Sequence, residues 1–436
     1  MTTAFAGGDH IMCIVNVLED RRFAYLKDVS DTIATLPFVN RTGKYLLTVD
    51  LSACLTLRSI PPLSFRHCEV LQAVWLNNDR LVHISVDAFH GAISLTALNA
   101  PLGSGVCRIP DAVQAIDTGA FALCFGLKRL CLNLKLQSIG DLESQYMKCT
   151  GAFEQCRNLK AVNIPKNAEL GKVGDRTFRY CRALETVTLP SKLAYLGASA
   201  FMGCERLQIV RMVGPVQTIP TMCFFACHNL TRLFLGPCVQ VIGSSSFRNC
   251  ANLQHVSFER TKLKTIGTKA FASCLKLETI TFRVHGTVDI MFRAFYNCSA
   301  LQDVWLPHCI DYVDTYAFER CEGLRMIVAN RVSAFVQGSI PPSTNGVRHS
   351  GVNVIAPRDA CVLLMVPVTC HHSILLRRYY WNWAPTTPLE RHCASVLGVF
   401  VTAMGRFARK FKLNLPNEIV CLILQHVEIG TITSTL

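Results

Sequence analysis

The sequence predicts an α/β repeat fold. It is a right-handed solenoid of about eleven turns that combines short strands with short helices and ends in helical caps. Two observations lead to this prediction. A heptapeptide pattern, Phe-x-x-Cys-x-x-Leu, recurs along the middle of the chain, and 50% of the 436 residues are hydrophobic. A chain this apolar buries a large core, and a repeat at regular spacing extends that core along an axis instead of around one centre.

The heptapeptide pattern occurs eleven times, once with alanine in place of cysteine. From Phe153 onward its phenylalanines are spaced 25, 23, 23, 23, 24, 24 and 23 residues apart. A turn therefore has roughly 23 residues, a length within the range of leucine-rich repeats. The phenylalanines are Phe65, Phe89, Phe121, Phe153, Phe178, Phe201, Phe224, Phe247, Phe271, Phe295 and Phe318.

Each turn contains the same elements in the same order. In one of them, Glu185 to Leu189 alternates polar and apolar residues, which predicts a half-buried strand, and Pro190 ends it. A second extended piece, Leu193 to Leu196, is followed by Gly197, where we expect a positive φ at a sharp corner. Ala198 to Arg206 is expected to be a short helix with the motif residues on one face.

Two longer spacings, from Phe89 to Phe121 and from Phe121 to Phe153, indicate insertions. Residues 97–112 and 138–150 hold the extra length. Insertions in a solenoid are expected to form loops on its rim, where partner contacts often occur.

The repeat closely resembles the BspA-type leucine-rich repeat, whose units read roughly I-P-x-x-V-x-x-I-G-x-x-A-F-x-x-C-x-x-L. The resemblance covers residues 46–327. It implies a solenoid used for adhesion or protein binding, without catalytic residues in the repeat. An extracellular adhesin is one form of this function, known from bacterial members.

The N-terminal segment, residues 1–45, lacks the repeat and is expected to be a helical cap. A cap of this kind shields the first apolar turn of a solenoid. The alternative is a docking motif, because residues 24–47 weakly resemble the second half of an F-box.

The repeat period is lost after residue 327. Residues 328–388 are expected to hold a last strand, within 352–357, and an irregular linker. Residues 389–436 are expected to form a helical tail, since Leu415 to Val427 has apolar residues at helical spacing. Its Leu-Pro-x-Glu-Ile opening resembles an F-box, and residues 388–416 loosely resemble a SOCS-type box. We favour a C-terminal cap over either docking motif.

Sequence motifs for catalysis are absent. The chain has no phosphate-binding glycine loop, no zinc-protease motif and no nucleophile-elbow motif. No C-x-x-C pair occurs, so we expect no metal and no cofactor. The net charge is +14, but the lysines and arginines are scattered, which predicts a solvated surface without nucleic-acid binding.

The sequence also gives expectations for location. The first residues lack the pattern of a secretory signal, and no apolar run is long enough to span a membrane. We therefore expect an intracellular, cytoplasmic location, where the 22 cysteines would stay free.

The functional prediction is a non-enzymatic scaffold that binds a protein partner through outward strand residues. The alternative is a substrate-receptor adaptor of a ubiquitin ligase that docks through its F-box-like or SOCS-like terminus. The residues expected to form the partner-binding surface are Trp75, Lys160, Glu185, Arg211, Arg232, His255, Glu278 and Trp305.

Overall fold

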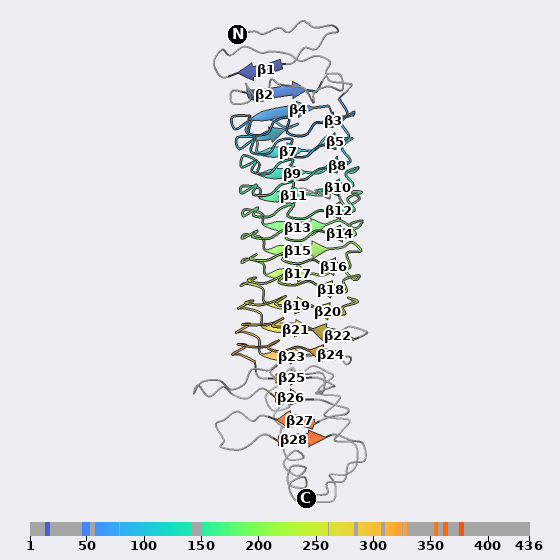
Figure 1. Cartoon of the computed structure of the whole chain (residues 1–436), viewed down its shortest axis with the longest axis vertical. Coiled ribbons are helices and arrows are strands. Elements are labelled where there is room, and N and C mark those ends of the chain that lie inside the picture. Colours follow the sequence, from blue (N-terminus) through green and yellow to red (C-terminus); the bar gives the residue numbers. More distant parts are fainter. Residues whose placement is uncertain are drawn as a thin grey trace, which may run out of the picture.

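A computed structural model shows a right-handed β-solenoid of about ten turns, stacked as a column (Figure 1). It describes residues 46–328, except 53–56, 78, 141–149, 260, 283–286, 307–309 and 325, together with strands β1 and β26 to β28. Residues 1–45 were predicted to form a helical cap, but Ile14–Val17, the part of this segment that is described, form strand β1, so a helix is not supported there. The predicted helical tail, residues 389–436, lies outside the described residues.

One side of the column is a long parallel sheet, here called sheet A. Each strand pairs with the next, in the order β2 (Leu46–Leu51), β4 (Ala73–Leu76), β6 (Ala97–Leu98), β7 (Val106–Arg108), β9 (Arg129–Cys131), β11 (Ala161–Asn163), β13 (Thr186–Leu189), β15 (Ile209–Met212), β17 (Arg232–Phe234), β19 (His255–Ser257), β21 (Thr279–Thr281), β23 (Asp303–Trp305), β25 (Met326–Val328) and β26 (Asn353–Ile355).

Antiparallel strands flank sheet A at both ends. At the first end, β1 (Ile14–Val17) pairs with β2. At the other end, β27 (Cys361–Leu364) pairs with both β26 and β28 (Leu375–Arg378).

A second side of the column carries two further parallel sheets, whose strands lie to the right of sheet A in Figure 1. Sheet B contains β3 (Ser59–Ile60), β5 (His83–Ile84), β8 (Ala115–Ile116), β10 (Ser138–Ile139), β12 (Lys172–Val173) and β14 (Tyr195–Leu196). Sheet C continues with β16 (Thr218–Ile219), β18 (Val241–Ile242), β20 (Thr265–Ile266), β22 (Val288–Ile290) and β24 (Ile310–Val313).

The predicted short helices are not formed, and no described residue is helical. In the segment expected to be a helix, the N–H groups of Ser199, Phe201 and Gly203 donate to carbonyls of the next turn, over 2.8–3.0 Å. The N–H groups of Met202 and Cys204 donate three residues back along the chain. A helix would direct every N–H along its own chain, so it would remove the bonds that join this side of the column.

Left-handed backbone makes this alternation of bonds feasible. Ser199 has a φ of 56° and Gly203 a φ of 70°. Most residues two positions before or after a motif phenylalanine share this conformation, and the majority are not glycine. The Phe, Cys and Leu of the motif are three residues apart. This spacing is compatible with these stacked turns as well as with a helix, so the sequence pattern does not distinguish the two.

Gly197 serves a different purpose from the one predicted. It does not have a positive φ. A Cβ at Gly197 would lie 2.3 Å from the backbone nitrogen of Asp175 in the preceding turn. Glycine is therefore required because two backbones approach closely at this corner.

The core is a single apolar cluster that runs along the column. The eleven motif phenylalanines stack in one series with ring centroids 5.0–5.6 Å apart. The motif cysteines and leucines are buried beside them. The predicted register of the Phe-Cys-Leu repeat is thus confirmed.

The insertion at residues 97–112 is more than a rim loop. It contributes both β6 and β7 to sheet A, whereas sheet B passes directly from β5 to β8. Sheet A thereby has one strand more than sheet B across this turn. The loop at residues 99–105 connects the two inserted strands and shapes the outer surface there.

Candidate protein-interaction surface

The outer face of sheet A is a regular surface that runs along the column. In β13, Val187 and Leu189 face the core, while Thr186 and Thr188 are exposed. The same alternation continues in β15 and β17. Because the strands are parallel and in register, the outward side chains form rows along the column axis.

Sheet A carries all eight residues that the sequence analysis proposed, on its strands or immediately before them. Lys160, Glu185, Arg211, Arg232, His255 and Glu278 are exposed, and Trp75 is half-buried. The backbone of Trp305 lies in β23, and its side chain lies outside the described residues. These positions extend from β4 to β23, so they form a long surface with no single centre.

The middle of this face holds an exposed cation–aromatic pair. The Arg211 guanidinium lies 4.3 Å from the ring centroid of Phe234 on the neighbouring strand. The Phe234 side chain is 43% exposed. Phe234 was missed by the sequence analysis, although the alternation in β17 places it on the same face as Arg232.

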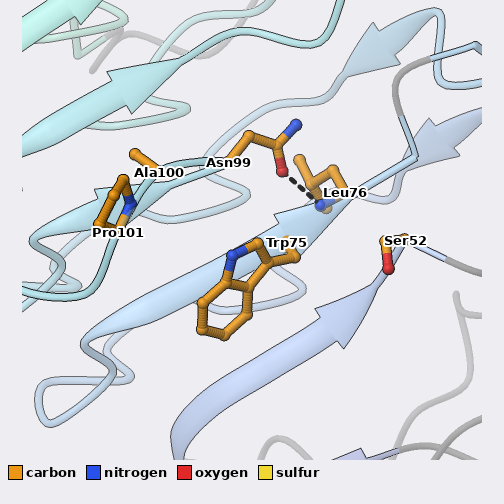
Figure 2. Close-up of a pocket in the computed structure, with 6 residues that line it drawn as sticks. All are labelled: Ser52, Trp75, Leu76, Asn99, Ala100 and Pro101. Carbon is orange, nitrogen blue, oxygen red and sulfur yellow. Dashed lines mark hydrogen bonds between the residues drawn. The ribbon is translucent and has the colours of Figure 1, made fainter.

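A shallow pocket of about 470 Å³ opens at the N-terminal part of sheet A (Figure 2). Its lining comes from β4, from the residue that follows β2, and from the loop of the insertion that follows β6. The residues are Ser52, Trp75, Leu76, Asn99, Ala100 and Pro101.

Asn99 determines the shape of this pocket. It has a φ of 46° and directly follows β6, and its side-chain oxygen accepts the Leu76 N–H at 2.6 Å. Asparagine tolerates left-handed backbone, and here its amide replaces the strand partner that β4 would otherwise lose. The chain can then leave the sheet at Ala100 and Pro101 and form one wall of the pocket.

A small second core lies under this wall. Ala73 and Ala97 point away from the main core, yet both are fully buried in a separate cluster with Ala100. Trp75 and Val106 pack against that cluster. The tryptophan is therefore held in place by packing and still has one accessible side.

A basic cluster adjoins the insertion. It consists of Arg108 in β7, Lys128 and Arg129 at β9, and Lys160 before β11, all exposed. None of the four forms an ion pair with a carboxylate among the residues that the structure describes. Of these four residues, the repeat pattern indicated only Lys160, because the insertion interrupts the period that would align the others.

The motif cysteines show no sign of reactivity. Burial raises the pKa of the Cys156 and Cys274 thiols to about 12, and a protonated thiol is a poor nucleophile. Within the described part of the chain, no group of histidine, cysteine and carboxylate side chains could hold a metal ion.

The comparisons with known proteins agree with this architecture. The model of the BspA-type leucine-rich-repeat region matches residues 44–150, 106–225, 149–261 and 217–338, in 6 copies. The chain therefore belongs to the BspA-type leucine-rich-repeat family. This confirms the resemblance noted in the sequence, but not the resemblance of the tail to an F-box.

Several solved structures are similar in sequence at a low level. A leucine-rich cell surface protein from Faecalibacterium prausnitzii is 21% identical, with 76% of this chain and 89% of that chain covered and a TM-score of 0.39. The leucine-rich-repeat protein of T. pallidum is 21% identical over 48% of this chain and 78% of its own, with a TM-score of 0.32. No curated protein matches. Among the described residues, no helix is long and apolar enough to cross a membrane.

Proposed function

We propose that this chain is a non-enzymatic scaffold that binds a protein partner through the outer face of sheet A. The observation that carries this proposal is the exposed Arg211–Phe234 pair on a rigid, continuous sheet. Arginine and aromatic side chains dominate the binding energy of protein interfaces. A preformed sheet also loses little conformational freedom on binding.

The chain offers a matched control on another face. Lys172 and Tyr195 form a similar pair in sheet B, with the ammonium 5.3 Å from the ring centroid, and Tyr195 is 49% exposed. The test is quantitative affinity purification of the full chain from the cells that express it. The double variant Arg211→Ala/Phe234→Ala should lose partners that Lys172→Ala/Tyr195→Ala retains. Equal recovery with both double variants would contradict the proposal.

The alternative function is that of an adaptor that presents a bound protein to a ubiquitin ligase. Its support is the sequence pattern of Leu415 to Val427, which lies outside the described residues. An adaptor should copurify with a Skp-like or elongin-like protein, and deletion of residues 389–436 should abolish that association while leaving the thermal melt unchanged. If the tail is a cap, the deletion lowers the melting temperature and promotes aggregation instead.

An intracellular, cytoplasmic location is part of the same proposal. Its support is the high content of free thiols, which persist in a reducing compartment. Imaging of the full chain with a C-terminal fluorescent fusion tests it, and a signal at the cell surface would contradict it.

A further inference from the structure

We propose that the N-terminal part of the outer face of sheet A binds an extended acidic peptide segment. One apolar side chain of the peptide occupies the Trp75 pocket, and its carboxylates lie over the basic cluster of Arg108, Lys128, Arg129 and Lys160. This inference names the chemistry of the partner and rests on the proposed function.

The first support is electrostatic. The four cations of the basic cluster lie on three consecutive strands, with Val106 paired to Arg129 and Arg108 paired to Cys131. Like charges on neighbouring strands repel one another, and none of the four forms an ion pair with a described carboxylate. An anionic ligand would relieve this repulsion and would be attracted to this part of the face.

The second support is continuity between the pocket and the cluster. Trp75 and Val106 pack on the same small core of alanines. Val106 pairs with Ala97 on one side and with Arg129 on the other. Apolar side chains, ending with Val106, thus lie between the pocket and Arg129.

The spacing sets the register of the ligand. Two strand steps separate Trp75 in β4 from Arg108 in β7, and three separate it from Arg129 in β9. At about 4.8 Å per step these are about 10 and 14 Å, which an extended peptide covers with about three to four residues. The apolar side chain should therefore precede or follow the acidic residues by about three or four positions.

A peptide fits this surface better than a nucleic acid. Glu185 follows Lys160 on the next strand, with its N–H bonded to the Lys160 carbonyl at 3.1 Å. Its exposed carboxylate would repel a phosphate chain that continued along the column. A peptide, in contrast, can carry its charges at one end and an apolar residue at the other.

The probe is a fluorescein-labelled nine-residue peptide with leucine at its second position, glutamate at its fifth to seventh positions, and glycine or serine elsewhere. Fluorescence anisotropy with the full chain measures its affinity at low and moderate salt. We expect binding that weakens with salt. Three peptide variants should each bind about tenfold more weakly. In the first, glutamine replaces the glutamates; in the second, glycine replaces the leucine; in the third, the leucine stands next to the glutamates. These peptide variants leave the protein unchanged.

Protein variants give a second, independent measurement. Arg129→Gln and Lys160→Gln should each weaken binding about threefold, and their combination about tenfold. Lys264→Gln is the matched control, because Lys264 is an exposed cation that immediately precedes β20 in sheet C. It removes the same charge and should leave the affinity unchanged.

Three outcomes would overturn this inference. The first is that Lys264→Gln weakens peptide binding as much as Arg129→Gln or Lys160→Gln does. The second is that the affinity does not depend on the position of the leucine. The third is that an oligothymidine strand binds more tightly than the peptide. If the peptide fails but the Arg211→Ala/Phe234→Ala variant still loses its partners, the inference is wrong and the proposed function stands. If neither effect is seen, both are wrong.

Discussion

Replacement of Cys250 tests how the buried thiols stabilise the column. Cys250 is fully buried, and its thiol donates to the carbonyl of Phe224 in the preceding turn at 3.2 Å. That carbonyl also accepts the N–H of Cys227 at 3.3 Å, so both of its lone pairs are used. The same thiol–carbonyl bond recurs along the ladder at 3.1–3.2 Å.

The magnitudes follow from these contacts. Cys250→Ala removes the hydrogen bond, at a cost of about 1 kcal/mol, and the buried sulfur, at a cost of about 1–2 kcal/mol including the cavity. We expect a loss of about 2–3 kcal/mol. Cys250→Ser keeps a donor that can reach the Phe224 carbonyl, so we expect a loss of only about 1 kcal/mol.

The ranking of the two variants decides between two explanations. Urea unfolding followed by circular dichroism should place serine above alanine in stability. If the slot were only apolar, an inserted hydroxyl would be the worse choice. An alanine variant more stable than the serine variant would therefore refute the hydrogen-bonded ladder. Ala92 occupies the cysteine position in one turn and so provides a control in the opposite direction. Ala92→Ser should leave the stability of the protein nearly unchanged.

Three further predictions concern packing, thiols and pH. Phe247→Ala should cost about 3–5 kcal/mol in urea unfolding, because Phe247 stacks on both neighbours at 5.2–5.3 Å; a near-wild-type midpoint would contradict the stack. Maleimide labelling read by mass spectrometry should modify the half-buried Cys131 and Cys238 before the buried motif thiols; uniform labelling would contradict their burial. The Asp117 hydrogen bond, 2.9 Å long, raises the pKa of His83. Its stabilisation is complete below about pH 6.5 and is lost as pH rises through the raised pKa, so melting temperatures of wild type and His83→Gln should converge at alkaline pH.

The sequence predicted those parts of the fold that depend on buried side chains. The phenylalanine series and the strand at Thr186–Leu189 follow from apolar spacing alone. The turn segments were predicted wrongly as helices because their conformation depends on hydrogen bonds to other turns. Residues such as Arg176, Met222 and Lys269 are left-handed, and nothing in their side chains indicates it.

The candidate surface was predictable only in outline. The alternation of strand residues identified Arg211 and Arg232 as outward, and it equally places Phe234 there. The Trp75 pocket and the basic cluster depend on how the insertion re-enters sheet A as β7. Strand pairing across an irregular insertion cannot be inferred from a period that the insertion itself interrupts.

The left-handed residues have a consequence for how such a column grows. Each non-glycine residue in this conformation is disfavoured by roughly 1–2 kcal/mol, and most turns contain two of them. A turn on its own would relax to another shape, and it holds this one only against a neighbour whose carbonyls receive its N–H groups. Each turn is thus a template for the next. The column should therefore open from its ends, and a duplicated turn inherits its shape from the turn beside it.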